Sequence, residues 1–259
     1  MAYIYEPAGK AKEYGDLALN MYTGCSHGCL YCYVPRACKV NPEAFHIPKV
    51  REINERALDR EIEKLRSNGS NGINPPQVFL CFTCDSYQHL DQEHRITRTI
   101  IQRLNRAGIG VRILTKAGLR STMDFDLLST STRNEYGATL TFVTHWQSKD
   151  WEPGAADPGD RIEALDKAHS LGIPTWASLE PVIDPEQSLE LIRLSAPYVD
   201  MYKVGKWNHD TRANAIDWPA FAAAAVELLK SLGKNYYIKK DLAAYLPEKE
   251  VIKQAVQVV

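Results

Sequence analysis

Short apolar runs alternate with longer amphipathic stretches along most of the chain. Runs of this length, bounded by polar and turn-forming residues, predict β-strands. The predicted strands are residues 17–22, 77–82, 110–115, 138–143, 174–179 and 199–204. The amphipathic stretches place apolar residues at the spacing of an α-helix. The predicted helices are residues 51–66, 92–107, 160–171, 185–194 and 218–232.

The alternation of strands and helices indicates the fold class. Gly108, Gly172 and Gly233 each directly follow a predicted helix, as at many helix C-termini, and an apolar run follows within a few residues. This rhythm predicts an α/β fold with a parallel sheet and right-handed crossovers, as a closed or partial barrel or an open doubly wound sheet. Both architectures place functional residues at the carboxyl ends of the strands. Since no repeat or Ser/Gly linker interrupts the chain, we expect a single domain over residues 1–259.

The composition excludes several other classes of protein. Hydrophobic residues make up 44% of the chain and charged residues 24%, which argues against a disordered or low-complexity protein. The 31 lysines and arginines nearly balance the 32 aspartates and glutamates, so any binding of nucleic acid must be local. The first residues lack the pattern of a signal peptide, and no 18 consecutive residues are apolar. We therefore expect a cytoplasmic location and no membrane association.

The cysteines carry the most specific chemical signal. They are Cys25, Cys29, Cys32, Cys38, Cys81 and Cys84. Four of them lie within fourteen residues, whereas a disulfide scaffold spreads its cysteines through a short secreted chain. The first three form a C-x3-C-x2-C pattern, in which three thiolates can converge on an iron–sulfur cluster, zinc or copper. Two alternatives are three buried apolar cysteines and a structural zinc site with Cys38 or His27 as the fourth ligand.

This cysteine loop resembles the signature of the radical S-adenosylmethionine (radical SAM) superfamily. In that family C-x3-C-x-aromatic-C follows the first strand of the barrel, and Tyr31 occupies the aromatic position here. The resemblance implies a partial (β/α)6 TIM-like barrel, a parallel sheet with outer helices. It also implies that Cys25, Cys29 and Cys32 hold three irons of a 4Fe-4S cluster, while the fourth iron binds S-adenosylmethionine (SAM). Reductive cleavage of SAM then yields a 5'-deoxyadenosyl radical, which abstracts hydrogen from the substrate.

Further stretches narrow the resemblance. They are residues 83–88 (TCDSYQ), 114–116 (LTK), 152–154 (EPG) and 160–165 (DRIEAL). With the cysteine loop they are similar to the spore photoproduct lyase-like (DNA repair photolyase-like) branch, although Cys84 and Ser86 depart from its T-D-P-Y-Q-type segment. The similarity covers about residues 17–208 and leaves residues 209–259 as a C-terminal extension. It implies a lyase-like enzyme that acts on a DNA lesion or another substrate and receives electrons from a flavodoxin- or ferredoxin-like reductant.

The resemblance also assigns cofactor-binding roles to Tyr31 and to three residues outside the cysteine loop. Lys116, at the end of the third predicted strand, would contact the SAM carboxylate, although it could also be a solvated loop lysine. Thr141 would face SAM or serve only as a strand residue. Arg161 would lie near SAM or form a structural salt link with an acidic neighbour such as Glu152.

Three residues are candidates for the chemistry on the substrate. In lesion lyases of this family a cysteine after the second strand donates a hydrogen atom to the product radical. Phe82 stands at that position here, so Cys84, just beyond the strand, is the candidate donor. Cys81 is expected to face away from Phe82, because neighbours in a strand point to opposite sides. Glu180 and Lys203, at the fifth and sixth strands, would bind a polar substrate or form an ion pair with each other.

Other features carry weaker signals. Lys206 and Asn208 would face the same opening as Glu180. His145 is interpreted as a hydrogen-bonded loop residue rather than a catalyst. Residues 234–240 interleave lysines and aromatic residues, which is typical of a closing strand with solvated lysines or of a surface that stacks on a base.

Three further functions compete with a radical SAM enzyme. They are a non-catalytic iron–sulfur electron carrier, a zinc-stabilised nucleic-acid-binding module and a barrel enzyme with incidental cysteines. Three clustered cysteines leave one iron of a cluster unligated, which disfavours the carrier, and the lack of a basic helix disfavours the nucleic-acid module. Iron content and SAM cleavage separate these functions.

Overall fold

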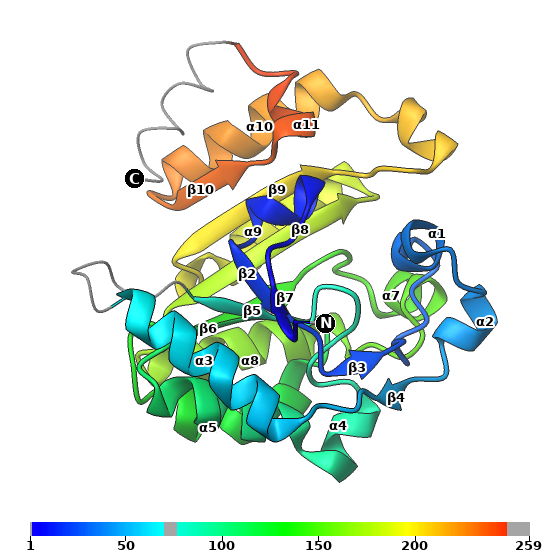
Figure 1. Ribbon diagram of the computed structural model, residues 1–259. Helices are drawn as coiled ribbons and strands as arrows, with labels where there is room; N and C mark the ends of the chain where they lie inside the picture. The colour runs from blue at the N-terminus through cyan, green and yellow to red at the C-terminus, as the bar shows by residue number, and fades with distance from the viewer. Residues whose placement is uncertain (1, 70–76, 248–259) are drawn as a thin grey trace.

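The computed structural model describes residues 2–69 and 77–247, which form a curved sheet with helices around it (Figure 1). The sheet contains, in spatial order, β1 (Ile4–Tyr5), β2 (Leu17–Leu19), β5 (Val78–Leu80), β6 (Val111–Thr115), β7 (Glu135–Thr139), β8 (Thr175–Val182), β9 (Met201–Lys206) and β10 (Asn235–Ile238). All neighbours pair in parallel except β1 and β2. A separate hairpin pairs β3 (Tyr22–Thr23) with β4 (Lys49–Val50).

Helices connect successive parallel strands. The longer ones are α3 (Glu55–Gly69), α5 (Ile96–Arg106), α8 (Pro158–Ser170), α9 (Pro185–Ser195) and α10 (Trp218–Ser231). The shorter ones are α1 (Val34–Cys38), α2 (Pro42–Phe45), α4 (His89–His94), α6 (Phe125–Leu128), α7 (His145–Trp151) and α11 (Lys240–Ala243), with 3₁₀ turns η1 (Gly9–Glu13), η2 (Gly118–Asp124), η3 (Ala196–Tyr198) and η4 (Thr211–Ala215). The parallel strands follow one another around the sheet without a reversal of order, which is the arrangement of a partial barrel rather than a doubly wound sheet. The predicted fold class is therefore confirmed.

Several predicted elements differ from the structure in detail. The fourth strand was expected at residues 138–143 but lies at Glu135–Thr139. Leu140 and Phe142 made the later residues look like a strand, but they are buried in the segment that follows it. The helix expected at 92–107 is divided at Arg95, whose φ of 53° separates α4 from α5. Residues 234–240 do contain a closing strand, β10. The expectation of solvated lysines there is wrong for Lys239, which is buried.

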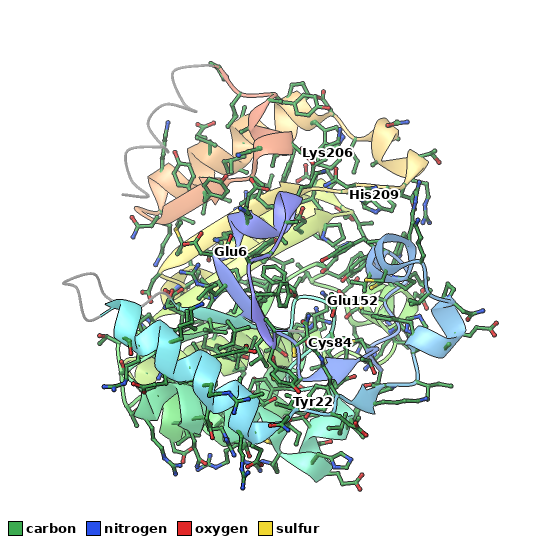
Figure 2. All side chains as sticks on the ribbon, in the orientation of Figure 1. Glu6, Tyr22, Cys84, Glu152, Lys206 and His209 are labelled. Atoms are coloured by element: carbon green, nitrogen blue, oxygen red, sulfur yellow. The ribbon has the colours of Figure 1, made fainter. Side chains whose placement is uncertain are left out.

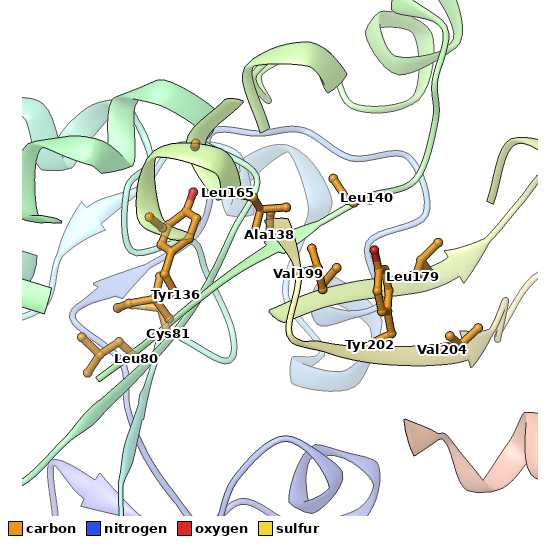
Figure 3. Packing of buried hydrophobic residues seen from close by; sticks show 14 of the residues in the cluster. Leu80, Cys81, Tyr136, Ala138, Leu140, Leu165, Leu179, Val199, Tyr202 and Val204 are labelled. Carbon is orange, nitrogen blue, oxygen red and sulfur yellow. The ribbon is translucent and has the colours of Figure 1, made fainter. Parts of the chain in front are cut away.

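The main hydrophobic core lies between the sheet and the surrounding helices. Figure 3 shows part of it, in which Tyr136 of β7 points toward Leu165 of α8. A smaller cluster contains Tyr14, Phe79 and Trp176, with ring centroids of Tyr14 and Trp176 5.9 Å apart. Tyr14 and Phe79 of this cluster also line a cavity inside the barrel.

The N-terminal segment links the two edges of the sheet. Glu13, at the end of η1, accepts hydrogen bonds on its carboxylate from the Tyr237 hydroxyl and the Lys240 backbone amide, both at 2.9 Å. Its carbonyl oxygen accepts a hydrogen bond from Lys203 Nζ at 2.5 Å. Since η1 lies between β1 and β2 in the chain, these bonds connect that edge to β9, β10 and α11. None of the described helices is long and apolar enough to cross a membrane.

Replacing Gly137 by alanine tests the packing inside the barrel. A Cβ atom at Gly137 would lie 2.4 Å from Cε2 of Trp176, so Gly137→Ala should lower the free energy of unfolding by about 1–3 kcal/mol. Urea denaturation measures this loss. Gly159→Ala is the matched control, because its Cβ would meet no atom within 4 Å, and we expect a change below about 1 kcal/mol. Equal losses in the two variants would contradict the packing argument.

Candidate active site

The cysteine loop, residues 24–33, joins β3 to α1 in a tight backbone path. The Cys25 amide donates a hydrogen bond to the carbonyl oxygen of Phe45 at 2.9 Å. Gly24 has a φ of 82°, and a Cβ atom there would lie 2.4 Å from the same carbonyl oxygen. Only glycine satisfies both the left-handed backbone and this close approach.

The loop also packs against the turn that follows α7. The Gly154 amide donates to the carbonyl oxygen of His27, and the Leu30 amide donates to that of Trp151, both at 2.8 Å. A Cβ atom at Gly154 would lie 2.2 Å from the carbonyl oxygen of Ser26. The turn at residues 152–154 and the cysteine loop are therefore in direct backbone contact.

A cavity of about 540 Å³ lies between the cysteine loop and the strand ends. The predicted site residues that line it are Cys25, Cys29, Tyr31, Cys32, Cys84, Lys116 and Glu180. Its wall also includes Phe82, Lys206 and His209, and Figure 2 shows Cys84 and Glu152 below Lys206 and His209. The structure thus brings residues from segments far apart in the chain to the wall of one cavity.

Below the cysteine loop, the carboxylate of Glu152 forms a buried hydrogen-bond network. Its Oε1 accepts from the Tyr31 hydroxyl and from Thr141 Oγ1, the latter at 3.0 Å. Its Oε2 accepts from Arg161 Nη2 at 2.5 Å, and Arg161 also donates to the carbonyl oxygens of Ala156 and Thr139. Glu152 and Arg161 are each only 1% exposed.

The charge of Glu152 is stabilised by its neighbours. Burial alone would raise the pKa of this carboxyl group, but the nearby Arg161 guanidinium and Lys116 ammonium lower it to about 2. The carboxylate is therefore ionised at neutral pH and forms a buried ion pair with Arg161.

A second buried carboxylate, Asp85, orients the end of β6. It accepts hydrogen bonds from Thr115 Oγ1 at 2.7 Å and from the Lys116 amide at 2.8 Å. The Tyr87 amide also donates to this carboxylate, at 2.8 Å. His27 is a further neighbour, whose Nδ1 lies 3.5 Å from the carboxylate and whose Nε2 lies 3.4 Å from Arg120. Burial lowers the pKa of His27 to about 4, so this imidazole is neutral at pH 7.

A third polar cluster lies at the carboxyl end of β8. Glu180 Oε2 accepts hydrogen bonds from the Tyr14 hydroxyl at 2.5 Å and from Lys239 Nζ. The Tyr14 hydroxyl is also 3.0 Å from Ser178 Oγ. A Cβ atom at Gly205 would lie 2.8 Å from the carboxyl carbon of Glu180. The Glu180 side chain is therefore held between the backbone of β9 and its two donors.

The comparison with protein families identifies the chain. The model of the radical SAM superfamily matches residues 19–194, more than half of the chain. The chain belongs to the radical SAM superfamily. This result confirms the family and supports the predicted enzymatic function, and the superfamily implies that SAM and an iron–sulfur cluster are bound.

Two relatives resemble this radical SAM protein over most of its length. Uncharacterized protein MJ0683 of Methanocaldococcus jannaschii is 26% identical over 186 residues, which cover 71% of this chain and 67% of that protein. Uncharacterized protein ORF301 of Acidianus two-tailed virus is 28% identical over 206 residues, which cover 74% of this chain and 64% of that protein. The chain thus spans about two thirds of the length of these two relatives.

Solved structures share its fold. Spore photoproduct lyase complexed with dinucleoside spore photoproduct matches with a TM-score of 0.69 at 13% identity, over 90% of this chain and 78% of that chain. SuiB of Streptococcus suis, bound to S-adenosylmethionine, matches with a TM-score of 0.64 at 13% identity, over 89% and 48%. These similarities support the partial-barrel architecture of this radical SAM protein.

The donor set of the cysteine loop fits an iron–sulfur cluster. Burial raises the pKa of the thiols of Cys25, Cys29 and Cys32, that of Cys29 to about 12, so a nearby metal charge is needed to stabilise their thiolates. Within residues 2–69 and 77–247, no three His, Cys, Asp or Glu side chains are placed so that they could hold one metal ion together. A cluster has no such requirement, because each cysteine binds a different iron.

Both proposed fourth ligands of the zinc alternative have other surroundings. The ring nitrogens of His27 face Asp85 and Arg120, as described above. Cys38 is exposed at the end of α1. The arrangement therefore gives the zinc alternative no support.

Thr141 and Arg161 support the cavity from outside its lining. Thr141 lies beyond the end of β7, and its hydroxyl is also 3.3 Å from the Tyr31 hydroxyl. Arg161 makes the structural salt link with Glu152 that was the alternative to a place near SAM. Both residues donate hydrogen bonds to the Glu152 carboxylate. Of Lys116 and Arg161, the two cations predicted near SAM, Lys116 lines the cavity and Arg161 does not.

The prediction that Lys203 faces the cavity opening is wrong. Because β9 continues to Lys206, Lys203 is a mid-strand residue, and its Nζ lies 5.1 Å from the ring centroid of Tyr14. Its hydrogen bond to Glu13 replaces the expected ion pair with Glu180, whose partner is Lys239. Burial lowers the pKa of Lys203 to about 7.

The segment after β5 also differs from expectation. The strand ends at Leu80, so Cys81 and Phe82 do not alternate across a strand, and both line the cavity with Cys84. The Phe82 ring stacks on that of Phe79 with centroids 4.1 Å apart. Cys84 does reach the cavity, as predicted for the candidate hydrogen donor.

The weaker predictions have mixed outcomes. Lys206 and Asn208 line the cavity with Glu180. His145 is not in a loop but is the exposed first residue of α7, and its Nδ1 lies 3.1 Å from Asp157.

Sequence reasoning missed Tyr14, Lys239 and the central position of Glu152. Glu152 lies in the EPG stretch, and its spacing of nine residues from Arg161 was the available signal. Tyr14 and Lys239 lie outside the region of resemblance, and only the closing of the barrel by η1 and β10 brings them to Glu180.

Glu152→Gln tests the buried ion pair. Loss of the charge leaves Arg161 buried without its counter-ion, so the free energy of unfolding at pH 7 should fall by roughly 3–5 kcal/mol. Glu163→Gln, in the exposed Glu163–Lys167 pair, is the control and should cost less than about 1 kcal/mol. Urea denaturation at several pH values measures both.

The pH dependence follows from the pKa of Glu152. Its folded value of about 2 lies below its ordinary value of 4.5, so its stabilising effect is complete above pH 4.5 and is lost as the pH falls toward 2. The difference between wild type and Glu152→Gln should therefore narrow over this range. A difference that stays constant or widens on acidification would argue against an ionised Glu152.

Proposed function

We propose that this protein is a radical SAM enzyme in which Cys25, Cys29 and Cys32 hold a 4Fe-4S cluster. The observation that carries the proposal is the convergence of these three cysteines and Lys116 on one cavity in a chain that belongs to the superfamily. When bound and reduced by one electron, the cluster supplies the electron that cleaves SAM into methionine and a 5'-deoxyadenosyl radical.

The protein side of this reaction is binding and positioning. Lys116 presents a cation in the cavity for the SAM carboxylate, and its Nζ lies 5.5 Å from the ring centroid of Tyr31. Tyr31 is held in turn by Glu152, which Thr141 and Arg161 orient. The network therefore fixes the wall against which SAM would bind.

The remaining cavity supports a substrate that combines an apolar planar part with polar edges. Phe82 and Trp207 contribute apolar rings, and Glu180 contributes a carboxylate. We propose a DNA lesion as the substrate, supported by the fold shared with spore photoproduct lyase and by Lys206 in the wall. Since the net charge is only −1, local cations such as Lys206 would have to attract the DNA backbone.

Cys84 and Glu180 are the residues proposed to act on the substrate. Burial and the neighbouring Cys81 raise the pKa of the Cys84 thiol well above its ordinary value, so the S–H bond that a hydrogen-atom donor needs is present at neutral pH. The second oxygen of Glu180 would accept a hydrogen bond from the substrate, because the first is already bound by Tyr14 and Lys239. A flavodoxin- or ferredoxin-like protein would deliver the electron.

We also propose that residues 1–259 form one radical SAM domain. β10, from the segment after residue 208, pairs in parallel with β9 and extends the same sheet. Lys239 from this segment lines the cavity. The C-terminal extension would thus be part of the active site.

Anaerobic reconstitution tests the cluster and the SAM reaction together. The wild-type protein should bind about four irons per chain and form 5'-deoxyadenosine from SAM in the presence of dithionite, as measured by chromatography. Cys29→Ala should lose this product, whereas Cys38→Ala, which changes an exposed cysteine, should retain it. Zinc in place of iron, or iron without SAM cleavage, would refute the proposal. If SAM is cleaved, ultraviolet-irradiated DNA is the first substrate to add to the reaction.

The role of Lys116 has a separate test. Lys116→Met should weaken SAM binding by about 10- to 100-fold, since it removes a charge-assisted contact, while iron content stays at the wild-type value. Lys167→Met, on the exposed face of α8, is the matched control and should bind SAM normally. Equilibrium dialysis of the reconstituted proteins measures the affinity, and unchanged binding in Lys116→Met would remove this assignment.

A further inference from the structure

A second pair of thiols lies in the cavity, apart from the cysteine loop. Cys81 and Cys84 form a C-x-x-C sequence directly after β5. Both line the cavity, and their thiols lie beside two consecutive residues, Cys81 beside Met21 and Cys84 beside Tyr22. Two thiols that follow the same strand and lie beside consecutive residues are placed to form a disulfide.

The backbone holds the two thiols in this arrangement. Cys81 has a φ of 65°, a left-handed conformation that residues other than glycine seldom adopt. The Cys81 amide donates a hydrogen bond to the carbonyl oxygen of Leu19 at 2.8 Å. Such strained residues persist only where their surroundings determine the conformation, and they concentrate at functional sites.

The two thiols differ in their neighbours and in how accessible they are from the cavity. Cys81 Sγ lies 3.8 Å from Met21 Sδ, in the hydrophobic core. Cys84 Sγ lies 3.5 Å from the carbonyl oxygen of Tyr22 and is only partly buried. Cys84 is therefore the thiol that a small molecule entering the cavity would meet first, and Cys81 would react second.

We propose that Cys81 and Cys84 are a dithiol site that a small disulfide such as oxidised glutathione converts to an internal disulfide. Cys84 would attack the small disulfide, form a mixed disulfide and release one glutathione thiol. Cys81 would then attack the Cys84 sulfur, form the internal disulfide and release the second. Two protein thiols are thereby oxidised, and one disulfide is reduced to two thiols.

The disulfide would remove the Cys84 S–H bond from the cavity. The consequence for catalysis rests on the proposed function, in which Cys84 donates a hydrogen atom. The formation of the disulfide is independent of that function, because it needs neither the cluster nor SAM. The two proposals can therefore fail separately.

Peptide mapping of the whole, anaerobically reconstituted protein tests the site. The protein is incubated with oxidised glutathione, quenched in acid, alkylated with N-ethylmaleimide and digested with trypsin. Cleavage after Arg66 and Arg95 yields a peptide, residues 67–95, whose two cysteines are Cys81 and Cys84, whereas the cysteines of the loop fall in residues 13–36 and Cys38 in residues 37–39. Mass spectrometry thus reads the three groups of thiols independently.

We expect the 67–95 peptide to become about 2 Da lighter and to resist alkylation. This internal disulfide should exceed the glutathione adduct of the same peptide by at least about tenfold, because the second thiol attacks within the protein. Dithiothreitol should restore two alkylatable thiols. In Cys81→Ser the remaining Cys84 should instead retain glutathione, and Cys38→Ala should behave as the wild type.

Two results would overturn the proposal. One is a 67–95 peptide that keeps both thiols under conditions in which the exposed Cys38 is fully modified. The other is a disulfide between the 67–95 and 13–36 peptides, since Cys84 would then pair with a cysteine of the loop. Either result is independent of whether the protein cleaves SAM.

Discussion

The buried carboxylate of Glu152 is the contact on which the arrangement of the cavity depends. A charge with an exposed fraction of 1% is stable only if it is paired and hydrogen-bonded. Its partners come from three different segments: Tyr31 from the cysteine loop, Thr141 from the end of β7 and Arg161 from α8. One ionised group therefore connects the loop to the barrel wall and to an outer helix, and its network holds the ring of Tyr31 that lines the cavity.

Close backbone approaches complete this arrangement. Gly24 and Gly154 lack the Cβ atoms that would collide with carbonyl oxygens of Phe45 and Ser26, so the cysteine loop can lie directly on its neighbours. On the far side, Glu13 joins the N-terminal segment to β9 and β10. Together these contacts hold the walls of the cavity in place, and fixed walls are a requirement for the radical chemistry that we propose.

Sequence reasoning was accurate where chemistry is local. The strand–helix rhythm predicted the fold class, and the cysteine spacing predicted a set of thiols that the structure places on one cavity. It was wrong where the exact end of a strand decides what a side chain meets. Lys203 lies three residues before Lys206, the β9 residue that lines the cavity, and Cys81 follows a strand that ends one residue before it.

The amino-acid sequence by itself determined the α/β class, the thiol donors and the family, because periodicity and ligand spacing are properties of neighbouring residues. Only the tertiary structure decided which charges meet. Glu180 pairs with Lys239 rather than Lys203, since the closing strand β10 brings a residue 59 positions away to its side. Burial keeps His27 neutral, whereas the nearby cations of Arg161 and Lys116 keep the buried Glu152 ionised, and in both cases the deciding neighbours are distant in the chain.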